Sequence, residues 1–437
     1  MRKTIQELTA FLDRSHSLYH AVAILVEMLE KAGYTRLSES RSWTLVPGGK
    51  YYLTRGGSAI VAFRVPQGSP RGFLMSASHS DHPTFKIKEN GELAGEYTRL
   101  ATEAYGGMII STWMDRPLSV AGRALVETDN GVESRLIDID RDLLLIPNVA
   151  IHMNRKVNEG YAWNVAVDTL PLLGSQEAAG KLADILEQAA GGKILGHDLY
   201  LYVRQKASVW GVEEEFISAS ALDDLECAWC CTKGFLAAKD SASIPVLCVF
   251  DSEEVGSNSA QGAASGLLES ILKRICQSLG LDLQQMLSQS FMVSADNAHA
   301  VHPNHPQYAD RANAPVLGGG VVLKFNASQK YATDGASAAV FRKICALADV
   351  PVQTYYNRAD LPGGGTLGRI SLTHVAVPTA DVGLAQLAMH SAYETAGVRD
   401  VKYLVDAMAA YYGCTLECAF DGNYVIQSCT TGKIHKI

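Results

Sequence analysis

The sequence contains no apolar stretch long enough to cross a membrane as a helix. Such a helix needs about 18 consecutive apolar residues, and no run of that length occurs in the 437 residues. The first 13 residues also lack the continuous apolar segment of a signal peptide, because charged side chains interrupt them. They predict instead an amphipathic helix with Ile5, Leu8, Phe11 and Leu12 on one face. We therefore expect a cytoplasmic protein with no membrane-spanning segment.

The sequence has no surplus of positive charge. It contains 46 acidic and 38 basic residues, which gives a net charge of −8, and no cluster of lysine and arginine stands out. Nucleic-acid-binding proteins usually carry a basic patch or stripe, so this composition disfavours that class. Hydrophobic residues make up 47% of the chain. That fraction suffices for ordinary globular cores, and the length predicts two domains.

The nine cysteines form no pattern of a disulfide framework. Their number is odd and they are scattered along a long chain, which is typical of reduced thiols. Cys227, Cys230 and Cys231 are the densest group, but no second pair of cysteines or histidines lies at the spacing of a zinc ribbon. We interpret the three as small core residues on a helix.

Strand and helix patterns alternate in the second half of the chain. Strand-like segments lie at 244–250, 290–294 and 373–377, and helix-like segments lie at 266–279, 334–346 and from 391 to 397. Alternation of this kind predicts an α/β fold with a mixed, largely parallel sheet and flanking helices. The stretch Gly363–Gly368 matches GxGxxG but follows loop sequence, so we interpret it as a loop near a substrate and not as a dinucleotide site.

Residues 85–219 show a different pattern. Short alternating segments are separated by turn signals such as Asp129-Asn130-Gly131, and a single amphipathic helix is expected at 175–190. This pattern predicts a β-rich domain inserted into the α/β domain. The α/β domain is then discontinuous, with residues 1–84 as its first segment and residues 220–437 as its second.

Potential metal ligands follow the ends of several strand-like segments. They are His79 with Asp81, Asp223 with Asp224, Glu253 with Glu254, Asp296 with His299, and His390. Taken singly, each is most simply a solvated turn or a satisfied buried histidine. Ligands in open α/β folds gather at the carboxyl ends of the strands, and buried carboxylates need pairing, hydrogen bonds or metal. Together these residues predict two divalent ions with nitrogen and oxygen ligands, which suits zinc and also manganese or cobalt.

Six motifs occur in a characteristic order along the chain. They are HSD at 79–81, ALDDL at 221–225, FDSEEVGS at 250–257, SADNAHAVHPN at 294–304, LKFNASQKYATD at 323–334 and QLAMHS at 386–391. With these motifs the chain resembles the aspartyl aminopeptidase family of di-zinc metallopeptidases, from about Phe11 to about Tyr412. The resemblance implies that residues 85–219 form a dimerisation domain. It also implies a homododecamer built from dimers, with enclosed active sites.

The resemblance assigns roles to individual residues. It implies that His79 and Asp296 bind one zinc ion, that Glu254 and His390 bind the other, and that Asp223 bridges the two. Glu253 is expected to act as the general base, and Asp81 to orient His79. Substrate contacts are expected from Lys324, Tyr331 and His299, and from His152 of a neighbouring subunit. Lys324 is the candidate partner for an acidic N-terminal side chain.

The implied function is an aminopeptidase that removes N-terminal Asp or Glu from peptides through a water that bridges the two metals. One alternative is a broad or neutral-specificity aminopeptidase, or an amide hydrolase of the same clan. Another is an inactive peptide-binding scaffold, which the intact set of ligands and base disfavours. The chain departs from the family at His82-Pro83-Thr84, at Asp224 and at Gly363-Gly364-Gly365, which leaves the side-chain preference open. The tail from about Gly413, with Cys414, Cys418 and Cys429, matches no family pattern.

Overall fold

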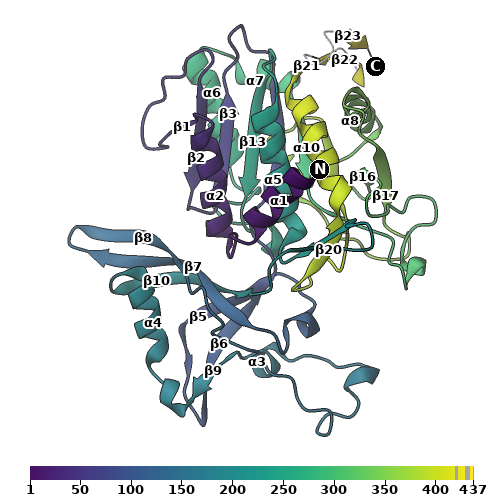
Figure 1. Ribbon diagram of the computed structural model, residues 1–437. Helices are drawn as coiled ribbons and strands as arrows, with labels where there is room; N and C mark the ends of the chain where they lie inside the picture. Colours follow the sequence, from purple (N-terminus) through teal and green to yellow (C-terminus); the bar gives the residue numbers. More distant parts are fainter. Residues whose placement is uncertain (419–421, 429–433, 437) are drawn as a thin grey trace.

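The structure is a computed structural model that describes residues 1–418, 422–428 and 434–436. Cys429, in the unmatched tail, lies outside the described residues. Figure 1 shows a large α/β part above and a smaller β-rich part below, joined near the middle of the molecule. Within the described residues, no helix is both long and apolar enough to cross a membrane.

A nine-stranded sheet forms the centre of the α/β part. Its strands, in spatial order, are β1 (Thr35–Arg36), β2 (Lys50–Arg55), β3 (Ala59–Arg64), β13 (Ile244–Phe250), β4 (Phe73–His79), β14 (Phe291–Ala295), β18 (Thr379–Gly383), β16 (Val321–Phe325) and β17 (Val352–Tyr356). The central strands β13, β4, β14 and β18 are parallel to one another. Antiparallel pairs occur at β2–β3, β3–β13 and β18–β16. The predicted mixed, largely parallel sheet is therefore confirmed.

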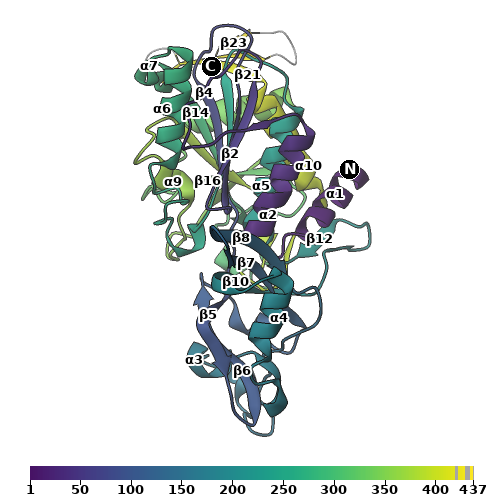
Figure 2. The ribbon, with the colours of Figure 1, turned by 90° about the vertical axis from the view of Figure 1, so that its left-hand side faces the viewer.

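Helices cover both faces of this sheet, as Figure 2 shows. One apolar cluster packs α1 (Arg2–Leu12), α2 (Leu18–Lys31), α5 (Leu222–Ala237), α8 (Gly335–Leu347) and α10 (Val398–Tyr412) against the sheet. The cluster on the opposite face contains α6 (Leu267–Leu279), α7 (Leu283–Ser288) and α9 (Leu367–Ser371). Because both faces are covered, the central strands β4 and β13 are buried along their whole length.

Several local predictions agree with the structure. Ile5, Leu8, Phe11 and Leu12 are the buried residues of α1. Cys227, Cys230 and Cys231 are buried, unbridged thiols on α5, as expected for core residues of a helix.

Two predicted elements were wrong. Residues 373–377 form turns after α9, and the strand β18 begins only at Thr379. Val375 and Val377 are apolar because they pack into the cluster around α6. The predicted helix at 391–397 contains the strand β20 (Glu394–Gly397), and the helix α10 starts at Val398. Pairing with neighbouring strands decides the conformation of this segment, because tertiary context outweighs local propensity.

The smaller part is built on a six-stranded antiparallel sheet. Its strands, in spatial order, are β8 (Gly131–Asp138), β7 (Leu118–Thr128), β10 (Ile194–Val203), β5 (Thr84–Leu93), β6 (Tyr97–Tyr105) and β9 (Leu172–Ser175). The predicted turn at Asp129-Asn130-Gly131 joins β7 and β8 as a hairpin. The sheet has its own apolar cluster, into which α4 (Lys181–Ala190) packs. Its short helices are η1 (Ile110–Trp113), η2 (Val157–Glu159), α3 (Val165–Asp168) and η3 (Gln176–Ala178).

A five-stranded sheet links distant segments of the chain. Its order is β11 (Ser208–Trp210), β12 (Phe216–Ala219), β20, β19 (Ala385–Leu387) and β15 (Ala298–His299). The last strand of the predicted insert, β12, therefore hydrogen-bonds with β20 in the C-terminal third of the chain. The remaining elements are η4 (Glu253–Val255), η5 (Pro306–Tyr308) and a small sheet of β21 (Cys414–Cys418), β22 (Tyr424–Ser428) and β23 (Ile434–Lys436).

Candidate active site

The strand-end residues meet at one edge of the nine-stranded sheet. His79 ends β4, the pair Glu253–Glu254 follows β13, and Asp296 follows β14. These three strands are parallel neighbours with β4 in the middle, so their carboxyl ends lie side by side. Asp223 comes from the start of α5, and His390 comes from the loop between β19 and β20. The structure thus brings together all five predicted ligands.

The potential ligand atoms form two groups that share one carboxylate. The first contains His79, Asp223, Asp224 and Asp296, and the second contains Asp223, Glu254 and His390. Asp223 Oδ1 lies 3.6 Å from His79 Nε2, and Asp223 Oδ2 lies 3.4 Å from His390 Nε2. His390 Nε2 is also 3.4 Å from Glu254 Oε1. Asp223 therefore presents one oxygen to each group, as a bridging ligand would.

The donor set fits divalent metal ions. Asp223 Oδ1 and Glu254 Oε1 are buried carboxylate oxygens that have no hydrogen-bond partner among the described residues. Such oxygens are costly to bury unless a cation neutralises them. Burial, with the nearby Asp223 carboxylate, raises the pKa of Glu254 well above its usual value. Imidazole and carboxylate ligands without thiolate suit zinc, manganese or cobalt.

Glu253 lines the same cavity but belongs to neither ligand group. Burial raises the pKa of its carboxyl to about 7, and the neighbouring carboxylate of Asp296 acts in the same direction. A carboxylate with a pKa near the working pH can both accept and release a proton. Glu253 can therefore exchange a proton, while Glu254 is placed as a potential metal ligand.

Asp81 makes more contacts than the sequence predicted. Its backbone carbonyl lies 3.0 Å from His79 Nδ1, and its Oδ1 lies 3.5 Å from the same nitrogen. Its carboxylate also accepts hydrogen bonds from the backbone amides of Glu253 and Glu254, each at 3.1 Å. The hydroxyl of Tyr105 donates to Oδ2 at 2.8 Å. Asp81 therefore fixes His79 and the glutamate pair together.

Three residues support the site in ways that were not predicted from the sequence. Tyr105, at the end of β6, ties the six-stranded sheet to Asp81. The carboxylate of Asp224 accepts the backbone amide of His79 at 3.1 Å. Glu394 accepts backbone hydrogen bonds from both Asp223 and His390. Of these three, only Asp224 was marked in the sequence, as a potential metal ligand within the ALDDL motif.

The loop that carries His390 is also anchored by the smaller part of the molecule. The backbone amide of Ile109 donates to the His390 carbonyl at 3.0 Å. Two residues further along, the amide of Ala392 donates to Thr112 Oγ1 at 2.9 Å. Residues that follow β6 therefore hold the loop of His390 directly.

The predicted substrate contacts, apart from His152, line the same cavity as the predicted metal ligands. This cavity has a volume of about 200 Å³, and its wall includes His299, Lys324, Tyr331, Gly364 and Gly365. The glycine-rich loop therefore lies at the site, as expected. Lys324 is buried, and its Nζ donates to the backbone carbonyls of Asp296 at 2.6 Å and Asn297 at 3.1 Å. It is the only lysine or arginine among the described residues that line the cavity.

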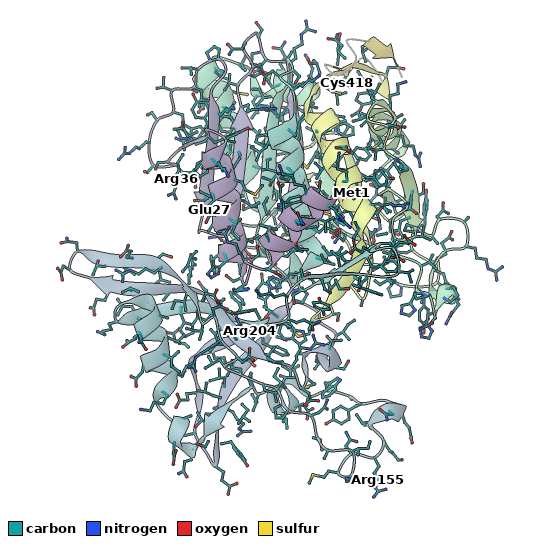
Figure 3. All side chains as sticks on the ribbon, in the orientation of Figure 1. Met1, Glu27, Arg36, Arg155, Arg204 and Cys418 are labelled. Atoms are coloured by element: carbon teal, nitrogen blue, oxygen red, sulfur yellow. The ribbon has the colours of Figure 1, made fainter. Side chains whose placement is uncertain are left out.

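His152 lies away from this cavity. It belongs to an exposed loop of the smaller part in which Met153 is 84% exposed. Figure 3 shows the nearby Arg155 at the outer end of this loop, far from the α/β part. Within one chain, His152 is therefore not brought together with the other predicted site residues.

Comparisons with known proteins show the family to which the chain belongs. Residues 11–412 match the family described as aminopeptidase I zinc metalloprotease (M18). The probable M18 family aminopeptidase 2 of Clostridium novyi (strain NT) is 42% identical over 426 residues, which cover 94% of this chain and 98% of the relative.

Two solved structures show the same fold. The cryo-EM structure of the Ape4 and Nbr1 complex superposes with a TM-score of 0.89 at 34% identity, over 94% of this chain and 85% of that chain. The S. cerevesiae mApe1 dodecamer has a TM-score of 0.82 at 26% identity, over 92% and 95% of the two chains. The chain therefore belongs to the M18 family of zinc metallo-aminopeptidases, which are exopeptidase hydrolases.

Proposed function

We propose that this aminopeptidase uses two zinc ions per chain and prefers peptides with N-terminal Asp or Glu. The observation that carries the two-metal proposal is the pair of ligand groups that share Asp223. His79, Asp223 and Asp296 would hold one ion, and Asp223, Glu254 and His390 would hold the other. Manganese or cobalt suits the same ligands. When bound, the ions supply an acidified water and polarise the scissile carbonyl.

Glu253 is the proposed general base. It is free of both ligand groups, and its pKa near 7 allows it to be ionised when substrate binds. Its carboxylate takes one proton from the attacking water and then gives that proton to the nitrogen of the leaving amine. Glu254 is held by coordination in this scheme, so it does not exchange protons.

The preference for acidic residues rests on Lys324. Burial lowers the pKa of this ammonium. Nearby carboxylates, chiefly that of Asp296, raise it, and the net effect is an increase. Lys324 therefore stays charged in the cavity wall and favours a substrate carboxylate. Because two backbone carbonyls already accept its hydrogen bonds, a neutral-specificity enzyme is the second candidate.

Self-assembly is part of the proposal. The relative from S. cerevesiae is described as a dodecamer, and the His152 loop of this chain exposes apolar side chains such as Ile151 and Met153. We infer a homododecamer of dimers formed through residues 85–219, in which His152 enters the cavity of a neighbouring subunit. Light scattering gives the mass of the assembly. A His152→Ala variant that assembles normally should lose activity.

The substrate preference is tested with a panel of amino-acid anilides. We expect kcat/KM to be higher for Asp- and Glu-anilides than for Leu- and Ala-anilides, with two zinc ions per chain by elemental analysis. Faster hydrolysis of the neutral anilides would refute the acidic preference and leave the aminopeptidase activity intact. Binding of a single ion by fully active enzyme would refute the two-metal centre.

A further inference from the structure

Glu394 lies where two ligand-bearing loops meet. It is the first residue of β20 and is only 2% exposed. Strand pairing places it opposite Ala219, the last residue of β12. Asp223 follows Ala219 by four residues, and His390 precedes Glu394 by four residues. The five-stranded sheet therefore places one buried carboxylate between the loop of Asp223 and the loop of His390.

The two oxygens of this carboxylate bind one backbone amide each. Glu394 Oε1 accepts a hydrogen bond from the amide of His390 at 2.6 Å, and Oε2 accepts one from the amide of Asp223 at 3.0 Å. In both contacts the side chain of Glu394 acts only as an acceptor. Glu394 belongs to neither group of potential ligand atoms. It acts on the two residues through their backbones.

The His390 loop has a conformation that needs such an anchor. Ala388 and His390 both adopt positive φ, at 55° and 67°. L-residues resist this left-handed conformation because Cβ crowds the backbone carbonyl. A second tie joins the same two loops, since Ser220 Oγ donates to the carbonyl of Ala392 at 2.8 Å. The position of His390 relative to Asp223 therefore depends on contacts between the loops.

We infer that Glu394 is a positioning residue that sets the distance between Asp223 and His390 and so completes the second metal site. This inference rests on the proposed function, because it takes Asp223 and His390 as ligands of the same ion. The first site depends on Glu394 only through Asp223, while the second depends on it through two of its three ligands. Loss of Glu394 should therefore weaken the second ion selectively.

The test is metal titration of a Glu394→Gln variant. Glutamine keeps the size of the side chain but offers one oxygen, so its NH₂ group would face one of the two amides. Metal-free protein is titrated with Co²⁺ and with Zn²⁺, and binding is followed by calorimetry and by the visible spectrum of Co²⁺. We expect the second ion to bind about 10–100-fold more weakly, with the first ion close to its wild-type affinity.

Asp400→Asn is the matched control. Asp400 is fully buried, and its carboxylate also accepts two backbone amides, from Gly318 at 2.6 Å and Gly320 at 2.8 Å. None of these three residues lines the cavity or belongs to a ligand group. The control should lower thermal stability without changing either metal affinity. If both variants lose metal affinity equally, the effect is general destabilisation and the inference is wrong.

Other outcomes separate this inference from the proposed function. A folded Glu394→Gln protein that binds both ions like wild type overturns the role of Glu394 and leaves the ligands unaffected. A His390→Ala protein that still binds two ions with wild-type affinity refutes the ligand assignment itself. If the glutamine variant does not fold, Glu394→Asp, which keeps the charge on a shorter side chain, should weaken the second ion alone. Equal weakening of both ions, or none, contradicts the inference.

Discussion

The carboxylate of Asp81 accepts the backbone amide of Glu253 at 3.1 Å. This hydrogen bond connects Asp81, which follows the proposed ligand His79 by two residues, to Glu253, the proposed base. It also fixes the start of η4, because the next amide, that of Glu254, donates to the other oxygen of Asp81. The base, one metal ligand and the orientation of His79 therefore share one support.

Replacing Glu253 by glutamine should remove the base and leave the ligands in place. We expect kcat to fall by at least about 10²-fold, the low end for loss of a general base. Both ions should be retained, because Glu253 belongs to neither ligand group. Steady-state kinetics together with elemental analysis check this prediction. Turnover close to wild type would exclude Glu253 as the base.

Replacing Asp81 by asparagine should disturb the support described above. The new NH₂ group would oppose one of the two backbone donors, so Glu253 and Glu254 should lose their orientation. We expect kcat/KM to fall by about 10–100-fold, as for other groups that orient metal ligands. Tyr105→Phe removes a single hydrogen bond to the same carboxylate and should cause a smaller loss. A larger loss of kcat/KM in Tyr105→Phe than in Asp81→Asn would contradict this prediction.

Lys324→Met tests whether this lysine recognises substrate or only supports the cavity wall. If its charge pairs with the substrate carboxylate, the ratio of kcat/KM for Asp-anilide over Leu-anilide should fall about 10-fold or more, since hydrogen bonds between charged groups are worth about 1.5–3 kcal/mol. If Lys324 only supports the carbonyls of Asp296 and Asn297, both rates should fall together. An unchanged ratio would assign it the structural role.

Removing the metals should lower thermal stability. Without a cation, the carboxylates of Asp223, Glu254 and Asp296 are buried close together, and burial already raises the pKa of Asp296 to about 6. A ligand at 100 times its Kd stabilises the folded state by about 2.7 kcal/mol. We therefore expect Tm to fall by about 3–5 °C in EDTA and to recover with zinc. The Asp223→Asn variant lacks the proposed shared ligand, so its Tm should fall less in EDTA than that of the wild type.

His20 should make stability depend on pH. Burial lowers its pKa from 6.5 to about 4 in the folded chain. Between these values the unfolded chain binds a proton that the folded chain does not, so stability falls as pH decreases below about 6.5. His20→Gln should remove about 1 kcal/mol of this loss at pH 5.5. Measuring Tm at pH 7.5 and pH 5.5 tests this prediction. His374→Gln, at a histidine on an exposed turn, is the control. A variant that follows the wild-type pH profile would contradict the assignment.

The sequence predicted those parts of the site that lie directly after strands. His79, Glu253, Glu254 and Asp296 could be placed because each follows a recognisable strand, and parallel strands present their ends at one edge. Asp223 and His390 were also singled out after apolar segments, but they lie at the start of α5 and in the loop between β19 and β20, not after strands of the central sheet. The individual roles of all these residues came from the family resemblance.

The supporting residues depend on contacts that no local pattern encodes. Glu394 is 171 residues from Asp223, and β20, which places it, was predicted as part of a helix. The role of Tyr105 depends on how the six-stranded sheet meets the α/β part. The sequence also could not indicate that Lys324 is buried with its ammonium bound to two carbonyls, and this contact makes its role in specificity a matter for experiment.

The anchoring of the His390 loop by Ile109 and Thr112 limits how this enzyme can be recombined with its relatives. A chimera that exchanges residues 85–219 as a unit would replace these anchors and Tyr105 along with the rest of the predicted insert. In such a chimera, the proposed metal ligands would come from one protein and the residues that support them from the other. Exchange points placed after Thr112 and before β12 keep these supports, and they also keep the pairing of β12 with β20 that places Glu394.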